Sequence, residues 1–251
     1  MVIKMSEKWL ILSYIPASLF SLRMTHATSK GGKTLLLPTP YCFKMTLIDS
    51  CFRAFAGHDA VAKAHQVFDL IKDKEIRFSP PNDCIVQNTF IKIKQEDREA
   101  PSGLFNSTIA YREFCFYNNG ELKVAIKIEE ISQNQIDLLT VLGKHINCIG
   151  KRGSFWQYTG NVITSDPLTT DFTIPKESAQ PQLNDYRWLQ HLDDFGDDLC
   201  KARDGFDRIS TFGQGTIKLN QHRVLVQTLL PYRFERSSKH FTQYKKLHSK
   251  G

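Results

Sequence analysis

The strongest local signal in the sequence is a tight turn between two runs of strand-forming residues. Asn118-Asn119-Gly120 follows IAYREFCFY and precedes ELKVAIKIEE. Asn and Gly tolerate the positive φ angles of a two-residue hairpin turn, whereas β-branched and aromatic residues favour extended strands. The pattern predicts a β-hairpin centred on residues 118–120, and therefore an antiparallel sheet in this part of the chain.

Hydrophobic spacing and turn residues predict the elements around this hairpin. We expect strands within 9–24, 84–94, 156–165 and 216–232, and helices over 40–56, 59–72, 133–146 and 185–203. The resulting order over residues 1–165 is β-α-α-β-β-β-α-β. It favours an α+β class, with a modified ferredoxin-like (RRM-like) antiparallel sheet and helices on one face. Residues 166–184 contain three prolines and are expected to form either a linker or an extended excursion, at the start of a C-terminal extension, 166–251.

Composition limits the class of protein. Of the 251 residues, 41% are hydrophobic and 24% charged, which excludes global disorder. No run of about 20 apolar residues occurs, so we expect neither a spanning helix nor a membrane partner. Lys4 and Lys8 precede an apolar run, as in a signal peptide, but Glu7 and Pro16 interrupt the pattern and favour a first core strand. Six irregularly spaced cysteines without a C-x2-C pair favour free thiols in the cytoplasm.

The positive charge is unevenly distributed. The net charge is +7, and residues 233–251 hold six Lys/Arg and one Glu, which is +5 in a 19-residue basic tail. Residues 185–207 hold seven Asp and three Lys/Arg, a local −4. The body is therefore nearly neutral, with an acidic segment and a basic tail. The tail is either a solvated, disordered terminus or a contact for a polyanionic partner.

The sharpest candidate for ligand binding is the glycine-flanked basic loop at residues 150–155. Its residues are Gly150, Lys151, Arg152, Gly153, Ser154 and Phe155. The glycines let backbone amides approach a phosphate, and the lysine and arginine supply charge and a bidentate donor. The serine adds a hydroxyl donor, and the phenylalanine can stack on a base. The alternative is a helix-to-strand turn with exposed basic residues.

Two strand positions are further candidates for RNA contacts. Arg112 shares a strand face with Phe114, where it could contact a phosphate or stack on a base. Asn88 lies in the polar, aromatic and basic alternation of residues 87–92. The alternatives are an ion pair of Arg112 on the sheet surface and an edge strand at residues 87–92.

A catalytic interpretation rests on three residues. A metal-independent ribonuclease needs a general base, a general acid and a group that stabilises the pentavalent phosphate. Tyr41 and the adjacent Lys144-His145 could supply these groups, but nothing in the sequence brings them together.

No metal or cofactor is expected. Asp193, Asp194, Asp197 and Asp198 are predicted to share a helix, where such carboxylates more often form a solvated face than a metal site. The motifs G-x-S-x-G, H-E-x-x-H and G-x-G-x-x-G are absent, which removes the common hydrolase, metalloprotease and Rossmann interpretations.

The order of these segments resembles the CRISPR-associated RAMP superfamily. The resemblance covers residues 9–160 and rests on the proline-led LLLPTPYCFKMTLIDSCFR, the strand AYREFCFY and the loop GKRGSFWQ. Within the superfamily, the chain is most similar to the type I Cascade subunit that caps the 5′ handle of the guide RNA.

The resemblance implies a cytoplasmic prokaryotic protein that binds the crRNA 5′ handle and bridges a backbone subunit and a large subunit of Cascade. It implies an RNA-binding domain over residues 1–165, with a thumb-like insertion at 80–108. The implied RNA contacts are the loop residues 150–155 together with Tyr41, Lys44, Asn88, Arg112 and Lys144. Target DNA is a further expected partner, through the basic tail.

Two alternatives stay open. One subtype of this subunit cuts precursor crRNA with a Tyr and an adjacent Lys-His pair. Tyr41 and Lys144-His145 resemble these residues. The other alternative is a structural adaptor with little RNA contact of its own, which would explain the modest charge of the body.

Overall fold

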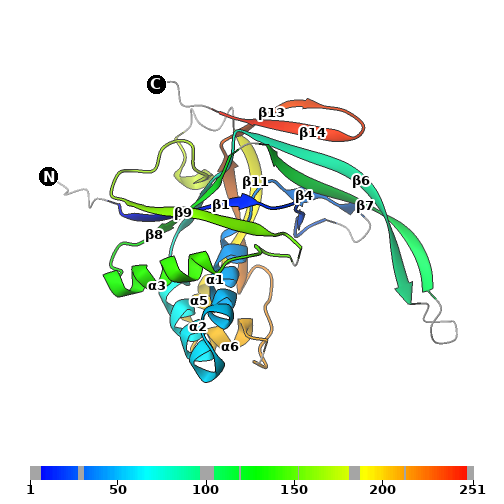
Figure 1. Cartoon of the computed structure of the whole chain (residues 1–251). Helices are drawn as coiled ribbons and strands as arrows, with labels where there is room; N and C mark the ends of the chain where they lie inside the picture. Colours follow the sequence, from blue (N-terminus) through cyan, green and yellow to red (C-terminus); the bar gives the residue numbers. More distant parts are fainter. Residues whose placement is uncertain are drawn as a thin grey trace.

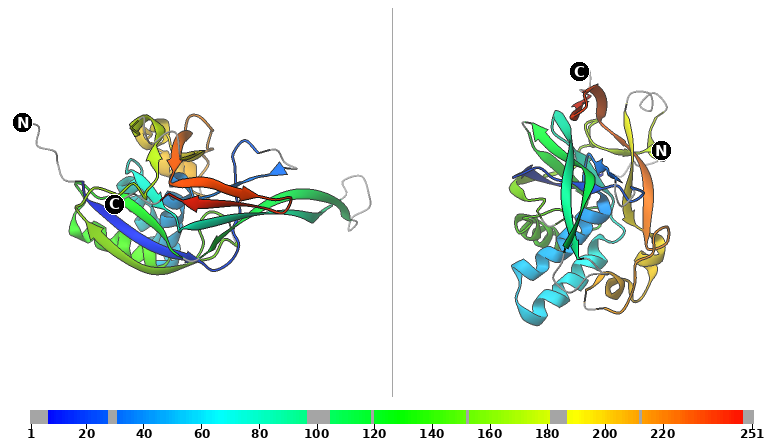
Figure 2. Two further views of the ribbon diagram at one scale, coloured as in Figure 1. Left: turned by 90° about the horizontal axis from the view of Figure 1, so that it is seen from above. Right: turned by 90° about the vertical axis from the view of Figure 1, so that its right-hand side faces the viewer.

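The computed structural model describes residues 7–27, 31–96, 105–118, 120–151, 153–180, 187–211 and 213–247. Strands predominate and a few helices accompany them (Figure 1), so the expected α+β class is confirmed. The three longer helices gather on one side of the body. A long two-stranded hairpin projects from the body, and the left view in Figure 2 shows it extending away from the helices.

The central sheet has four antiparallel strands in the order β5-β8-β1-β9. Their bounds are β1 Trp9–Pro16, β5 Ile76–Ser79, β8 Leu122–Lys127 and β9 Trp156–Thr164. Helices α1 (Pro40–Ala54) and α2 (Gly57–Ile71) connect β1 to β5, and α3 (Gln133–Lys144) connects β8 to β9. This order and connectivity agree in general with the ferredoxin-like plan of two β-α-β units.

Local signals in the sequence explain where the helices begin. The Thr39 hydroxyl accepts a hydrogen bond from Cys42 N at 3.1 Å, and Pro40 occupies the first turn of α1. Such a cap contributes about 1 kcal/mol. Ser132 and Gln135 form a reciprocal capping box at the start of α3. The helices expected near 40–56, 59–72 and 133–146 are therefore confirmed.

The two faces of β1 pack against different parts of the chain. Leu10, Leu12 and Tyr14 belong to the main core with the helices, and the Tyr14 hydroxyl donates to Gly143 O in α3 at 3.0 Å. On the other face, Trp9 and Ile11 join a smaller cluster that includes Phe172. This alternation is the period-2 pattern of a strand that is buried on both faces.

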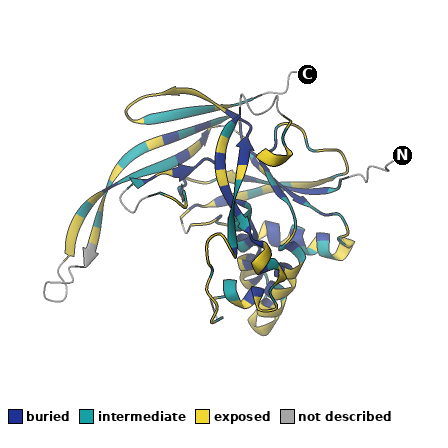
Figure 3. Cartoon of the chain, turned by 180° about the vertical axis from the view of Figure 1, so that it is seen from behind, coloured by how far each residue is buried: buried dark blue, intermediate teal, exposed yellow. Residues whose placement is uncertain are grey.

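A second sheet of five strands is built on the projecting hairpin. Its order is β13-β14-β6-β7-β3, with β3 Gly31–Gly32, β6 Asp83–Glu96, β7 Phe105–Asn118, β13 Tyr232–Ser237 and β14 Phe241–Lys246. Strands β6 and β7 pair antiparallel along their full 14 residues each. The base of the hairpin is buried and its outer part is exposed (Figure 3).

The hairpin predicted around residues 118–120 is wrong. Strand β7 pairs with β6, whereas β8 lies between β1 and β5 in the other sheet. The chain therefore passes from one sheet to the other at Gly120, whose φ is +131° and which lies against Pro81. A turn motif specifies a local change of direction, but burial decides the pairing: Val124 and Ile126 are fully buried in the middle of the central sheet.

A third sheet replaces the helix predicted over residues 185–203. It has the order β10-β12-β11, with β10 Ile174–Pro175, β11 Trp188–Phe195 and β12 Arg223–Leu230. Three short helices (η1 Lys176–Ser178, α5 Asp197–Lys201, α6 Gly205–Ile209) and the pair β2 (Leu22–Arg23) and β4 (Thr34–Leu35) complete the described elements. The acidic residues expected on one helix face are divided between β11 and α5, because Gln190 and Leu192 follow the period-2 burial of a strand.

The basic tail is ordered rather than a solvated terminus over residues 233–247. Strands β13 and β14 form a hairpin, and β14 pairs with β6 from Phe241–Gln87 to Lys245–Asp83. The hairpin is anchored by Tyr232, which is fully buried and donates from its hydroxyl to Pro81 O at 2.9 Å. The charged residues of β13 are exposed to solvent, so they do not oppose its pairing with β14.

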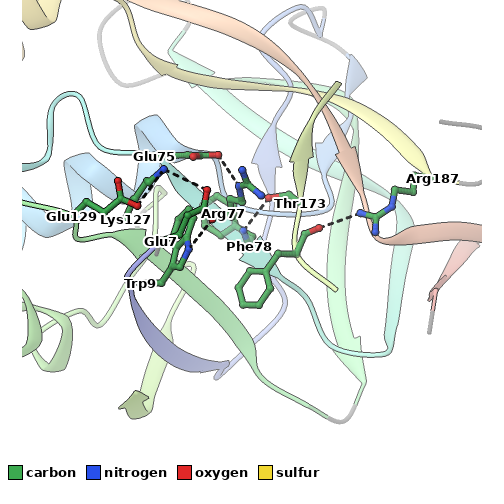
Figure 4. A network of polar contacts seen from close by, with 10 residues as sticks. Glu7, Trp9, Glu75, Arg77, Phe78, Lys127, Glu129, Thr173 and Arg187 are labelled. Carbon is green, nitrogen blue, oxygen red and sulfur yellow. Dashed lines mark hydrogen bonds and ion pairs between the residues drawn. The ribbon is translucent and has the colours of Figure 1, made fainter. Parts of the chain in front are cut away.

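Polar contacts join the segment after residue 166 to the central sheet (Figure 4). Phe78 N in β5 donates to the Thr173 hydroxyl at 3.0 Å, and Arg187 donates to Phe172 O at 3.1 Å. Nearby, Arg77 lies 5.5 Å from the ring centroid of the buried Trp9. The expected linker is therefore packed against the sheet where the structure describes it.

No helix among the described residues is long and apolar enough to cross a membrane. All six cysteines are free, as expected. Cys51, Cys84 and Cys115 are fully buried and serve as small core residues.

Candidate nucleic-acid interface

The glycine-flanked loop lies between α3 and β9, where the sequence predicts a turn. Backbone hydrogen bonds close it: Ser154 N donates to Lys151 O at 3.0 Å, and Ile149 N donates to Ser154 O at 3.2 Å. Gly150 has a φ of +79°, and a Cβ there would lie 2.7 Å from Cys42 Sγ in α1. Only glycine therefore fits this backbone and this close approach to the helix.

A cavity of about 470 Å³ opens beside this loop. Its walls come from the loop, the first turns of α1, the β2–β4 pair and the third sheet. The lining side chains that carry charge are Arg23, Asp49, Lys151, Asp193 and Arg223. The cavity therefore offers three cations and two carboxylates, with hydroxyls and apolar groups around them. Such a lining fits a ligand that has anionic and hydrogen-bonding parts.

Tyr41, Arg223 and Asp193 form one wall of the cavity. The Arg223 guanidinium lies 4.8 Å from the centroid of the Tyr41 ring, and its Nε donates to Asp193. Asp193 is only 2% exposed, so the arginine compensates a buried carboxylate. Burial raises the pKa of the Tyr41 hydroxyl. The charge of Arg223 lowers this pKa in part, and the charge of Asp193 raises it. The hydroxyl therefore keeps its proton at neutral pH and is a hydrogen-bond donor rather than a general base.

The cysteine on this wall is not a nucleophile. Burial, with a smaller contribution from Asp193, raises the pKa of Cys42 to about 12. The thiolate is the reactive form of cysteine, so at neutral pH this side chain remains an inert thiol.

Lys44, which the sequence suggests as an RNA contact, is 1% exposed. Its Nζ lies 2.8 Å from Asp194 Oδ1 and donates to Lys72 O at 3.1 Å. Burial raises the pKa of Asp194, and the Lys44 ammonium opposes that shift. The structure thus places Lys44 in a buried ion pair between α1 and β11, away from the surface that RNA could reach.

The loop residues differ in how accessible they are. Lys151 and Gly153 are exposed, and Phe155 is 54% exposed, whereas Ser154 is buried. Arg152 lies outside the described residues. Among the loop residues that the structure describes, Lys151 is the one whose side chain is charged, exposed and part of the cavity wall.

The other predicted contacts are not brought to this cavity. Asn88 and Arg112 lie in the five-stranded sheet, where Asn88 Nδ2 donates to Lys239 O at 3.2 Å. Lys144 and His145 are exposed at the end of α3, and Arg53 Nε donates to His145 O at 3.0 Å.

The three residues of the catalytic interpretation are likewise separated. Arg53, whose side chain reaches His145, lies twelve residues after Tyr41 on α1. At 1.5 Å per residue this is about 18 Å along the helix axis. Tyr41 and the Lys144-His145 pair therefore lie near opposite ends of the helix, rather than around one phosphate.

The acidic residues considered for a metal site have other partners. Asp193 contacts Arg223, Asp194 contacts Lys44, and Asp197 contacts Lys201. Within the residues that the structure describes, no group of three or more His, Cys, Asp or Glu side chains could hold a metal ion.

Sequence reasoning missed Arg23, Asp49 and Arg223 as members of this site. These residues lie up to 200 positions apart, and each stands in an ordinary strand or helix context. The Arg223–Asp193 pair is visible only in the structure, where Asp193 is buried in β11 and therefore requires a cationic partner.

Comparison with known proteins gives one relative in sequence. The CRISPR-associated protein Cas5 of Archaeoglobus fulgidus is 25% identical over 151 residues, which cover 57% of this chain and 65% of that protein. The chain thus spans about 65% of the length of this relative. No protein-family model matches the chain. The sequence similarity confirms the expected resemblance to CRISPR-associated proteins of the RAMP type.

A solved structure is also similar in outline. A crystal structure described as a CRISPR protein from Archaeoglobus fulgidus superposes on 95% of this chain and 92% of its own, with 10% identity and a TM-score of 0.42.

Proposed function

We propose that this chain, a relative of the CRISPR-associated protein Cas5, binds the 5′ handle of a crRNA within a type I Cascade complex. The observation that carries the proposal is the cavity beside the glycine-flanked loop, because it joins Lys151 with Arg23 and Arg223 around one space of about 470 Å³. A space of this size with cationic walls suits a nucleotide, and the loop offers backbone and side chain to its phosphate.

Each part of the site has a proposed role. Lys151 pairs with a phosphate as a point charge, and Arg23, which also lines the cavity, contacts a second phosphate. Phe155, 54% exposed next to the loop, stacks on a base. Tyr41 offers a hydroxyl donor to the edge of a base in the cavity, and Asp193 holds Arg223 beside the Tyr41 ring.

The rest of the chain has proposed roles in assembly. Residues 1–165 act as the RNA-binding domain, and the β6–β7 hairpin acts as a thumb that reaches a backbone subunit. Phe90 and Ile109 in the hairpin are 72% and 70% exposed, which favours a partner for this segment. Residues 166–251 act as an extension that completes the RNA site through Asp193 and Arg223 and faces the large subunit.

The test is RNA binding by the purified chain. Fluorescence anisotropy would measure the affinity for a labelled repeat-derived handle RNA across a range of salt concentrations. Lys151→Ala is expected to weaken binding and to reduce the slope of log K against log salt by about 0.7, the value for one phosphate contact on a single strand. Lys176→Ala is the matched control, because Lys176 is an exposed lysine that does not line the cavity.

Two outcomes would contradict the proposal. Unchanged affinity in Lys151→Ala and Arg23→Ala would remove the cavity as the handle site, and absence of RNA binding at low salt would favour the structural adaptor. Incubation with repeat RNA in EDTA tests the endoribonuclease alternative. Cleavage that is lost in His145→Ala would favour that alternative over a non-catalytic role.

A further inference from the structure

The five-stranded sheet has one face packed on the core and one face open. On the packed face, Cys84, Val86, Cys115 and Tyr117 are buried and belong to the main core. The opposite face is formed by the alternate residues of β6, β7, β13 and β14, and its apolar side chains belong to neither hydrophobic cluster. Phe116, in β7, is 45% exposed. Figures 1 and 3 show the C-terminal hairpin alongside β6 in this sheet.

Strand register places aromatic residues in neighbouring rows of this open face. Phe116 lies opposite Ile85, which lies opposite Gln243 on the next strand. Phe114 lies opposite Gln87, which lies opposite Phe241. Residues two apart on a strand are separated by about 7 Å, and neighbouring strands by about 4.8 Å. Phe114 and Phe116 are therefore about 7 Å apart, and Phe241 lies about 10 Å from Phe114 across Gln87, so the three phenylalanines form a platform with Gln87 between its two parts.

Cations border this platform on both sides. On one side, Arg236 lies opposite Gln243, and its guanidinium is 5.7 Å from the centroid of the Phe241 ring. On the other side, the Arg112 side chain crosses β3 at Gly32, where an added Cβ would lie 2.7 Å from Arg112 Cδ. The missing side chain at Gly32 is therefore what allows Arg112 to lie along the edge of the sheet.

The charge of the face is positive. Its cations are Arg112, Arg233, Arg236 and Lys245, and its acids are Asp83 and Glu235, which gives four minus two, or +2. Glu235 lies 3.4 Å from Arg233 and 3.6 Å from Lys245 at the outer edge. Glu235 thus forms these ion pairs with Arg233 and Lys245, and not with Arg112 or Arg236, the two arginines that border the phenylalanines.

We propose that this open face, the platform of Phe114, Phe116 and Phe241 bordered by Arg112 and Arg236, binds single-stranded nucleic acid independently of the handle site. Bases stack on the phenylalanine rings, and the arginines contact the phosphates on either side. A protein partner fits less well, because the cores of protein interfaces are depleted in charged residues, whereas aromatic strands bordered by arginine are typical of single-strand binding sheets.

The test uses the full chain and mixed-sequence 12-nucleotide oligonucleotides, as RNA and as DNA, that lack the repeat sequence. Phe116→Ala and Arg236→Gln are each expected to weaken binding about fivefold to tenfold, and Arg236→Gln also lowers the salt slope by about 0.7. Ile109→Ala is the matched control, because Ile109 is 70% exposed in the same strand but on the opposite face. The RNA and DNA arms decide which nucleic acid is preferred.

A second measurement separates this surface from the handle site. Lys151→Ala is expected to keep the binding of mixed-sequence oligonucleotides, and ultraviolet cross-links are expected to map to the peptide that contains Phe114 and Phe116. Unchanged affinity in a Phe116→Ala/Arg236→Gln variant with wild-type circular dichroism overturns the proposal. Cross-links that map only to residues 148–156, or a Phe116-dependent affinity for a protein subunit without nucleic acid, also overturn it.

Discussion

At the residue scale, two glycines in the same loop meet different physical constraints. Gly150 and Gly153 both have positive φ angles, +79° and +94°. A Cβ at Gly150 would meet Cys42 and Leu22 within 2.8 Å, whereas a Cβ at Gly153 would meet nothing within 4 Å. The pair therefore separates the cost of backbone conformation from the cost of close packing.

We expect Gly153→Ala to lower the free energy of unfolding by about 1–2 kcal/mol, the cost of the left-handed conformation for a residue with a Cβ. Gly150→Ala is expected to lower the free energy of unfolding by more, because the loop must move away from α1 to make room for the Cβ. The same movement changes the shape of the cavity, so handle RNA binding is expected to weaken. Urea unfolding and anisotropy on both variants give the comparison. Equal losses in the two variants would mean that the contact with Cys42 does not hold the loop in place.

Lys44 and Asp194 make a second residue-scale prediction. Lys44→Met leaves a carboxylate that is largely buried without its cation, so we expect a loss of about 3 kcal/mol. Lys201→Met is the control, because its ion pair with Asp197 is exposed to solvent and its loss should leave the stability nearly unchanged. The double variant Lys44→Met/Asp194→Asn should recover part of the stability in urea unfolding. A similar loss in the Lys201 control would contradict this explanation.

At the scale of elements, the β6–β7 hairpin is a projection whose outer part adds little to the core. Val86 and Cys115 are buried at its base, but Phe90 and Ile109, farther out, are 72% and 70% exposed. The free energy of folding therefore depends on the base, while the outer strands are available to a partner.

Replacing residues 92–109 by Asn-Gly joins Ile91 to Ala110, which are paired across the hairpin. A two-residue turn of this type suits antiparallel neighbours. We expect the free energy of unfolding to change by less than about 1 kcal/mol, and handle RNA affinity to be retained, because the cavity lies elsewhere. Pull-down with a backbone subunit should fail. Intact assembly of the shortened chain would show that the hairpin is not the thumb.

At the scale of the whole molecule, the segment after residue 166 is part of the same core as the sheet before it. Buried side chains from this segment in the main cluster are Leu192, Phe195, Leu199, Phe206, Leu230 and Tyr232. The extension also supplies Asp193 and Arg223 to the cavity. The site and the core are thus assembled from both ends of the chain.

A fragment of residues 1–165 is therefore expected to lack a cooperative unfolding transition. Each of the six missing apolar side chains leaves a cavity worth about 2–5 kcal/mol, and the sum of about 12–30 kcal/mol equals or exceeds the stability of most domains, which is about 5–15 kcal/mol. Circular dichroism melting of the fragment, alone and co-expressed with residues 166–251, tests this. A fragment that melts as cooperatively as the full chain would contradict the shared core.

The sequence by itself determined the local structure of this protein. The three long helices, the first strand and the turn at 150–153 follow from apolar spacing, proline, capping residues and glycine, which act over a few neighbouring residues. It also pointed to Lys151 and Tyr41, which the fold places on one cavity. Pairing between distant strands leaves no such local signal.

Only the tertiary structure decided which strands pair and which charges meet. The turn at Gly120 joins two sheets instead of closing a hairpin, because β8 lies between β1 and β5, where Val124 and Ile126 are fully buried. Lys44 is removed from the surface by Asp194, a partner 150 residues away, and Arg223 enters the site through β12. Burial and charge compensation are properties of the assembled chain, so sequence patterns that span ten or fifteen residues cannot contain them.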